Sequence, residues 1–330
     1  MSSLAGKRVL VTGAGGFIGS HLVEALVSEG AQVRALVHYN SRGEWGHLEQ
    51  VAPVVREAIE VVVGDIQDGF SVARAVQGRE LVFHLAALIG IPYSYVAPRS
   101  YIDTNVLGTL NVLEAARAAG VERMVQTSTS EVYGTARYTP IDEQHPIQGQ
   151  SPYSASKIGA EKLAESYARS FGAPVTILRP FNTYGPRQSL RAVIPTVMAQ
   201  ALAGGEIRIG SATPIRDFTF VEDTARAFMA AASAPGGEGA TFNAGSGRSI
   251  TVGDLAQLIL EIVGCEGPLV CEQTRVRPRA SEVGELLCDA ARLRAATGWE
   301  PEVGLRMGLE RTLEWMRETR ASARTAVYTV

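Results

Sequence analysis

Hydrophobic residues in the first half of the chain alternate between short continuous runs and longer stretches with helical spacing. The runs are rich in Val, Ile and Leu, which is typical of parallel strands covered on both faces. This pattern predicts strands at 8–12, 32–37, 61–63, 81–84, 123–127 and 175–178, with helices between them, for example at 18–28 and 101–119. Such alternation predicts an α/β fold with a doubly wound parallel sheet.

The pattern changes after residue 178, where Pro and Gly become frequent and helices at 254–263 and 305–316 are separated by irregular segments. We therefore expect a smaller C-terminal domain made of residues 179–216 and 244–330. Residues 1–178, with about 217–243, would form the larger domain. Within 101–119 an apolar stripe at helical spacing could face either the sheet or a second subunit; it consists of Ile102, Val106, Leu110 and Leu113.

Composition and charge exclude several classes of protein. The 330 residues include 31 Lys and Arg against 34 Asp and Glu, so the net charge of −3 gives no reason to expect nucleic acid or an anionic membrane as partner. The longest apolar run, at 81–91, is too short to span a bilayer. The N-terminus has no apolar stretch of signal-peptide length, and the three cysteines lack metal-type spacing. We expect a cytoplasmic protein without a metal.

Glycines follow the first predicted strand at a spacing that suits a phosphate. The strand runs into residues 13–19, which contain Gly13, Gly16 and Gly19 together with Phe17 and Ile18, and then into a helix. A tight turn needs residues that tolerate positive φ, and the N–H groups at a helix start favour an anion. In this strand–turn–helix context, the glycines predict dinucleotide binding by a Rossmann-type domain.

The end of the second strand should read the adenosine ribose, and here the usual carboxylate is missing. Residues 36–42 contain His38 and Arg42 but no Asp or Glu. A carboxylate at this position would have favoured NAD, and its absence leaves NADP open. We expect NAD as the cofactor. Asp65, followed by Ile66, could accept a hydrogen bond from the adenine amino group, or could instead form a turn or helix cap.

Tyr153 and Lys157 are four residues apart on a predicted helix, so they share one face. An ammonium group one turn away should lower the pKa of the tyrosine, whose ordinary value near 10 makes it a poor base. Residues 127–134 add hydroxyls and a single carboxylate, Glu131, at the end of a strand. Ligands of open α/β sheets bind at that edge.

These motifs together resemble the extended short-chain dehydrogenase/reductase family, over Lys7 to Met316. Ile91–Tyr95 and Ser128–Gly134 are most similar to nucleotide-sugar 4,6-dehydratases of the legionaminic acid pathway type, which act on an N-acetylglucosamine nucleotide. The matching segments are 13–19, 84–87, Asn105, 127–134, 153–157, 179–186, 216–223 and 298–301.

The resemblance implies a role for each catalytic residue. Tyr153 would remove the 4-hydroxyl proton of the sugar while hydride passes to the nicotinamide, and Lys157 would hold the nicotinamide ribose. Thr129 would hydrogen-bond the 4-oxygen, and Glu131 would remove the C5 proton so that water leaves across C5 and C6. Ser130 stands where many glucose-nucleotide dehydratases have Asp, although mannose-nucleotide dehydratases are similar to this chain in having Ser-Glu. The implied cofactor-binding residues are Gly13, Gly16, Phe17, Ile18, Gly19, His38, Asp65, Ile66, Leu85, Ala86, Ala87, Tyr153 and Lys157.

The resemblance also implies a nucleotide-sugar site and a homodimer. Asn182, Arg216 and Arg277 would contact the diphosphate, for which guanidinium groups are well suited. Tyr93 and Arg187 complete the implied substrate-binding residues. Helices around 101–119 and 153–171 would form the dimer interface. The basic residues at 275–279 could instead be a solvated loop.

Three other functions remain open. A nucleotide-sugar 4-epimerase shares everything except the carboxylate at Glu131, and a UDP-glucuronic acid decarboxylase shares the segment around it. A non-catalytic dinucleotide-sensing protein would be of another class, but such proteins characteristically lose the tyrosine or lysine that are both present here.

Overall fold

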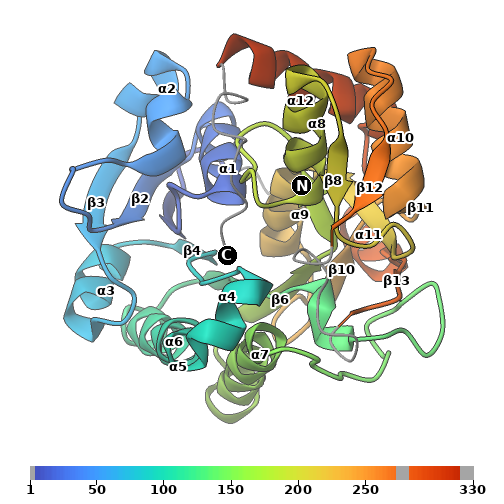
Figure 1. The fold of residues 1–330 in the computed structure, drawn as a ribbon. Helices are drawn as coiled ribbons and strands as arrows, with labels where there is room; N and C mark the ends of the chain where they lie inside the picture. Colours follow the sequence, from blue (N-terminus) through green and yellow to red (C-terminus); the bar gives the residue numbers. More distant parts are fainter. Residues whose placement is uncertain (1–3, 273–281, 320–330) are drawn as a thin grey trace.

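A computed structural model describes residues 4–272 and 282–319, and a parallel seven-stranded sheet lies at its centre (Figure 1). The strand order is β10-β6-β5-β4-β1-β2-β3, and every neighbouring pair is parallel. The Rossmann-type α/β fold expected from the sequence is confirmed. The strands are β1 Arg8–Thr12, β2 Gln32–His38, β3 Glu60–Gly64, β4 Leu81–His84, β5 Arg123–Thr127, β6 Val175–Pro180 and β10 Thr241–Ala244.

Helices cover both faces of this sheet, which explains why its strands are apolar throughout. On one face, α1 (Phe17–Ser28) packs beside α9 (Val221–Ser233), and their side chains share a core with β1. On the other face, residues of α3 (Gly69–Val76), α6 (Gly108–Ala118) and α7 (Pro152–Phe171) form a second core. Both faces of the sheet are therefore covered, and a ligand can approach it at the ends of the strands.

The helix expected at 101–119 is interrupted by a π-helical turn, η2 (Ile102–Leu107), between α5 (Pro98–Tyr101) and α6. A π turn inserts an extra residue and rotates the faces of the helix. The expected apolar stripe is consequently divided: Leu113 is buried, whereas Ile102 is 45% exposed. Further short elements are η1 (Gly46–Gln50), α2 (Pro53–Glu57), α4 (Ile91–Val96) and η3 (Ser130–Tyr133).

The chain leaves the large sheet after β6, builds a second region, and returns through α9 and β10. In that region β9 (Ile215–Phe220) pairs with β7 (Asn182–Tyr184), β11 (Ser249–Thr251) and β13 (Glu285–Leu286), and a third hydrophobic core lies around them. Because β9 belongs to the smaller sheet, the return to the larger one begins at α9. The division into two folding domains stays a prediction. The remaining elements are β8 Ile207–Ile209, β12 Leu269–Cys271, α8 Val193–Ala203, α10 Val252–Val263, α11 Ala291–Thr297 and α12 Leu305–Glu318.

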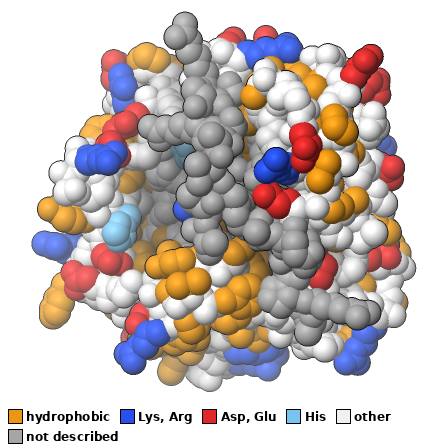
Figure 2. All heavy atoms as spheres, viewed as in Figure 1, with side chains coloured by type: hydrophobic (Ala, Val, Ile, Leu, Met, Phe, Trp, Pro, Cys, Tyr) orange, Lys and Arg blue, Asp and Glu red, His pale blue; other side chains and the backbone are white. Residues whose placement is uncertain are grey.

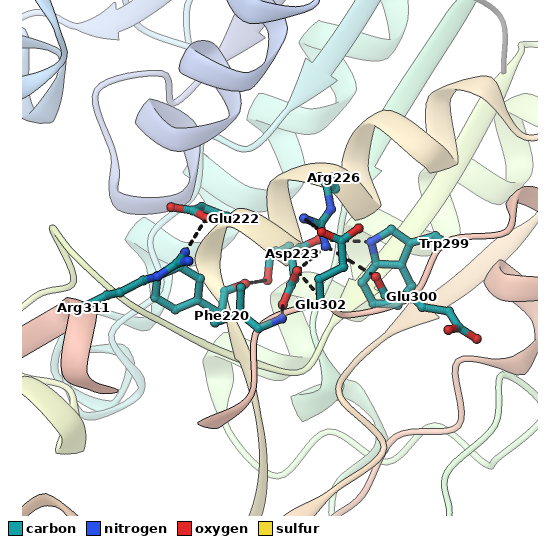
Figure 3. A network of polar contacts seen from close by, with 10 residues as sticks. Phe220, Glu222, Asp223, Arg226, Trp299, Glu300, Glu302 and Arg311 are labelled. Atoms are coloured by element: carbon teal, nitrogen blue, oxygen red, sulfur yellow. Dashed lines mark hydrogen bonds and ion pairs between the residues drawn. The ribbon is translucent and has the colours of Figure 1, made fainter. Parts of the chain in front are cut away.

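A polar network at the start of α9 fastens the C-terminal part of the chain (Figure 3). The buried carboxylate of Asp223 accepts hydrogen bonds from the backbone N–H groups of Glu302 and Val303, each at 3.0 Å. The indole N–H of Trp299 donates to the Asp223 carbonyl at 3.1 Å. Arg226 pairs with both Asp223 and Glu302. The segment that leads into α12 is thus held on a helix of the large sheet.

None of the helices within 4–272 and 282–319 is both long and apolar enough to cross a bilayer.

Candidate active site

The turn between β1 and α1 approaches the segment after β4 so closely that side chains are excluded. Gly13 has φ of 69°, and a Cβ there would lie 2.7 Å from the backbone nitrogen of Ala86. A Cβ on Gly19 would lie 2.2 Å from the Gly13 carbonyl oxygen. Gly16 provides no side-chain cap for α1, so the first N–H groups of the helix, at Phe17 and Ile18, face the turn. These residues fit the diphosphate of a dinucleotide.

A hydrogen-bonded chain fixes the predicted cofactor segment 85–87 beside this turn. The Thr12 hydroxyl accepts from the backbone N–H groups of Leu85 and Ala86, each at 3.2 Å. His84 lies between the hydroxyls of Thr12, at 2.7 Å, and Thr109, at 3.1 Å. Burial first, and Lys157 second, lower the pKa of His84 to about 3. This neutral histidine therefore supports the site instead of transferring protons.

At the outer end of the sheet, His38 and Asp65 come together as neighbours on β2 and after β3, with 3.5 Å between Nε2 and a carboxylate oxygen. The other Asp65 oxygen accepts a hydrogen bond from the Gln67 backbone at 2.9 Å, so Asp65 does form a turn. Ile66 is buried behind it. The roles of these three residues toward adenosine stay predictions.

The helix α7 carries Tyr153 and Lys157 on one buried face. Its start is defined by Ser151, whose hydroxyl accepts from the Ser154 backbone in a reciprocal capping box, and by Pro152 in the first turn. Tyr153 is 8% and Lys157 4% exposed. Both groups are therefore shielded from bulk water, and neighbouring side chains determine how easily each becomes charged.

The Tyr153 hydroxyl lies beside Thr129 and Glu131. Burial is the largest influence and raises the pKa of Tyr153; the Thr129 hydrogen bond opposes this rise, while the charge of Glu131 and the nearby Tyr101 add to it. The net direction is opposite to the lowering expected from Lys157. The physical reason is that burial disfavours the charged phenolate, and this effect is the largest one on Tyr153.

Lys157 is buried and lies near a carboxylate, that of Glu161. Burial lowers the pKa of Lys157 to about 8, and Glu161, one helical turn further on, raises it. Glu161 itself forms a buried two-point ion pair with Arg179, at 2.9 and 2.7 Å. Lys157 therefore titrates close to neutral pH.

Glu131 lies on the short helix η3 and lines the main cavity. Thr129 caps this helix, because its hydroxyl accepts a hydrogen bond from the Glu131 backbone N–H at 3.2 Å. The adjacent Ser130 is 3% exposed and is not among the described residues that line the cavity. The structure thus brings Thr129, Glu131 and Tyr153 together and leaves Ser130 behind them.

The cavity, of about 340 Å³, runs from Glu131 into the second region of the chain. Asn182 and Arg216 line it, as the sequence predicted for diphosphate contacts. Arg216 is held by the carboxylate of Glu282 at 3.2 Å and by the Ile215 carbonyl at 2.9 Å. Arg191 and Arg208 also line the cavity and were not predicted. Arginines at several points of one wall suit a polyanionic ligand.

Two predicted substrate residues, Tyr93 and Arg187, are not among the described residues that line the cavity. Tyr93 is 41% exposed on α4, where hydrophobic side chains gather on the surface (Figure 2). Its ring lies 6.3 Å from that of Tyr101, which in turn contacts Tyr153 edge-on. Arg187 is buried against α1 and is not among the cavity-lining residues that the structure describes. Arg277 lies outside the described residues.

Sequence reasoning missed the role of Asn105 as a support. From the π turn, its amide accepts the Leu88 backbone N–H at 2.8 Å and donates to the Leu88 carbonyl and the Ser156 hydroxyl, both at 2.9 Å. Ser156 follows Tyr153 on α7, so Asn105 joins the catalytic helix to the segment after β4. The only available signal was its place in a matching motif. Within the described ranges, no group of three or more His, Cys, Asp or Glu side chains could hold a metal.

Comparison with known proteins agrees with this geometry. The sequence model of the family described as GDP-mannose 4,6 dehydratase matches residues 10–312. A UDP-glucose 4-epimerase of Mycolicibacterium smegmatis is 34% identical, over 94% of this chain and 98% of that protein. A dTDP-glucose 4,6-dehydratase of Actinoplanes sp. is 31% identical, over 95% and 99%.

A solved structure of a dehydratase has the same fold as this chain. The dTDP-glucose 4,6-dehydratase DesIV from Streptomyces venezuelae, crystallised with NAD and TYD bound, superposes with a TM-score of 0.84 at 31% identity. The match covers 95% of this chain and 98% of that one. Extent, identity and fold together place the chain in the GDP-mannose 4,6-dehydratase family of extended short-chain dehydrogenases/reductases, whose members include nucleotide-sugar dehydratases and epimerases.

Proposed function

We propose that the protein is an NAD-dependent nucleotide-sugar 4,6-dehydratase, which converts a nucleoside-diphosphate hexose to its 4-keto-6-deoxy derivative. The observation that supports this most directly is the position of Glu131. Its carboxylate borders the same cavity as the arginines and lies close enough to raise the pKa of Tyr153. A 4-epimerase needs no base at C5, whereas a dehydratase does.

The residues present fit a dinucleotide. Gly13, Gly16 and Gly19, with the first N–H groups of α1, would hold its diphosphate, and the segment 85–87 would lie beside it. When bound, the cofactor would supply an acceptor for the hydride from C4 and the same hydride for C6, so the overall reaction would be redox-neutral. NAD is bound in the DesIV structure, which supports NAD here.

Tyr153 and its neighbours would handle the first proton. Tyr153 takes the proton of the sugar 4-hydroxyl, and Thr129 keeps the phenol oriented by their hydrogen bond. The transfer requires Tyr153 to be a phenolate beforehand, which the Lys157 ammonium would stabilise, and it leaves Tyr153 as the phenol. Burial of Tyr153 and Lys157 excludes water from this transfer.

Glu131 would handle the second proton. A 4-keto group makes the C5 hydrogen acidic, so Glu131 accepts it as a proton and then donates that proton to the C6 hydroxyl, which leaves as water. We propose an N-acetylglucosamine nucleotide as substrate, from the resemblance carried by residues 91–95 and 128–134. The diphosphate would be neutralised by Arg216, assisted by Arg191. We also propose a cytoplasmic homodimer.

A nucleotide-sugar 4-epimerase is the second candidate. A relative with that name is 34% identical. Oxidation and reduction at C4 would need only Tyr153, Thr129 and Lys157. In addition, the buried Ser130 stands where many glucose-nucleotide dehydratases have an acidic residue. A decarboxylase of UDP-glucuronic acid remains a third candidate.

Product mass separates these candidates. The protein is incubated with UDP-, GDP- and dTDP-linked glucose, N-acetylglucosamine and glucuronic acid. A dehydratase lowers the mass of the sugar nucleotide by one water, and a decarboxylase lowers it by carbon dioxide. Unchanged mass with an altered C4 configuration identifies an epimerase and overturns the proposal.

Replacement of Glu131 tests the proposed base. Glu131→Gln keeps size and hydrogen bonding but accepts no proton, so dehydration should fall by about 10²-fold or more. Exchange of the C5 hydrogen with deuterium from solvent should stop, because C4 oxidation alone does not move that proton. Glu131→Asp, which retains a carboxylate, is the matched control and should keep measurable exchange. Rapid C5 exchange by Glu131→Gln would assign the step to another residue.

A further inference from the structure

Arg187 holds a backbone conformation that residues with side chains rarely adopt. Its φ is 69°, the single positive φ at a non-glycine residue in the part of the chain that the structure describes. The residue is 6% exposed. A left-handed conformation of this kind is unfavourable for a residue with a Cβ, and it persists where surrounding contacts enforce it, often at functional sites.

The enforcing contacts come from helix α1. Nη2 of Arg187 donates to Nδ1 of His21 at 2.8 Å and forms an ion pair with Glu24. Nε2 of His21 lies 3.0 Å from the Pro186 carbonyl oxygen and 3.2 Å from Nε of Arg187. Arg187 thus contacts both ring nitrogens, and because a guanidinium group only donates, the ring accepts in the neutral form. Burial first, and Arg187 second, lower the pKa of His21 to about 3, so the ring stays neutral near pH 7.

These contacts lie directly behind the phosphate loop. His21 is one helical turn after Phe17, the first residue of α1, and their rings meet edge-on at 6.0 Å. Burial first, and the charge of Arg187 second, lower the pKa of His47, whose backbone N–H donates to the Gly15 carbonyl at 2.9 Å. The Nη1 atom of Arg187 is buried and has no hydrogen-bond partner among the described residues.

The chain that follows Arg187 forms a wall of the main cavity. Gln188, Arg191, Ala192 and Val193 all line it, and Gln188 is anchored to the Thr183 carbonyl at 2.9 Å. Arg187 therefore has its side chain on the cofactor helix and its backbone at the start of the substrate wall. A shift of α1 would be passed to that wall through one residue.

We propose that Arg187 is a positioning residue that couples the two sites, so that a dinucleotide on α1 increases the affinity of the cavity for a nucleoside diphosphate. The proposal rests on the proposed function for the existence of a nucleotide site in the cavity. Thermodynamic linkage makes the effect reciprocal, and such couplings typically change affinity by about 5–150-fold.

Calorimetric titration tests the coupling. UDP, GDP and dTDP are titrated into the full chain with saturating NAD and into protein stripped of NAD, and the nucleotide that binds tightest is used for all variants. Wild type should bind it about 10-fold more tightly with NAD. Arg187→Gly removes the contacts yet suits the positive φ, and Glu24→Gln removes the charge partner. Both should reduce the ratio to below about 2, and the KM for nucleotide sugar should rise far more than kcat falls.

Glu238→Gln is the matched control, because it breaks an ion pair with the largely buried Arg123 away from both sites. It should keep the wild-type ratio and the wild-type KM. Melting temperatures identify any variant that fails to fold, and the other variant then carries the test. An unchanged ratio in a folded Arg187→Gly or Glu24→Gln protein, or a wild-type ratio of one, overturns the coupling. Absence of any nucleotide binding by wild type would instead count against the proposed function.

Discussion

At the scale of single residues, burial decides the electrostatics of the site. Tyr153 and Lys157 are both deeply buried, and desolvation moves each pKa against the charged form: upward for Tyr153 and downward for Lys157. Glu161 acts in the other direction on Lys157. The ammonium needed beside Tyr153 is therefore retained by a carboxylate that Arg179 holds in place.

This balance predicts the alkaline limb of activity. The pKa of Lys157 is about 8, so the ammonium form dominates below that pH and is lost as the pH rises through it. We expect kcat/KM for the nucleotide sugar to fall as pH rises through about 8. Because Glu161 raises this pKa, Glu161→Gln should move the limb to lower pH. Initial rates measured between about pH 6 and pH 10, a range that includes the ordinary pKa values of Tyr and Lys, check both statements. A wild-type limb near pH 10 or a shift to higher pH would contradict them.

At the scale of elements, the π turn η2 is the feature that aligns the catalytic helix. It presents Asn105 to the backbone of Leu88 and to Ser156, so the segment after β4 and α7 are joined through one amide. π turns often occur at functional sites because they redirect a side chain without ending the helix. The regular helix expected from the sequence could not have shown this.

Removal of that amide should loosen both elements. Asn105→Ala leaves the partly buried Leu88 N–H and carbonyl without this partner, which costs about 1–3 kcal/mol of folding stability. NAD affinity should fall too, since residues 85–87 precede Leu88. Asp103→Ala, on the same turn but paired at the surface with Arg99, should stay within about 0.5 kcal/mol. Urea unfolding and NAD titration of both variants provide the test, and equal behaviour would refute the role of Asn105.

At the scale of the whole molecule, the second region is attached to the large sheet through α9. Asp223, fully buried, binds the backbone of residues 302 and 303 and pairs with Arg226 (Figure 3). The motif 216–223 thus serves two purposes. Arg216 lines the cavity, and seven residues later Asp223 fastens the segment that leads into α12.

Asp223→Asn should weaken this attachment. The new amide places a donor against a backbone N–H and removes the charge that faces Arg226, so we expect a loss of about 3 kcal/mol, typical of a broken buried pair. Glu302→Gln changes the exposed partner of Arg226 and should cost under about 1 kcal/mol. Thermal unfolding compares the two, and a similar cost for both would show that the buried contacts are unimportant.

The sequence by itself determined the elements and motifs whose causes are local. Strand periodicity predicted the parallel sheet, and the spacing of Gly13, Gly16 and Gly19 predicted the tight turn, because both depend on residues close in the chain. The sequence also placed Tyr153 and Lys157 on one helical face, with Glu131 at a strand end near them.

Tertiary structure alone decided how those motifs meet. It determined that the pKa of Tyr153 is raised, since desolvation depends on how distant segments of the chain pack around the hydroxyl. It moved Arg187 from the expected substrate surface to α1, more than 160 residues away in sequence, and brought Arg191 and Arg208 into the cavity. Local patterns record which faces are buried, but the partner of a buried charge is chosen only when the whole chain has packed.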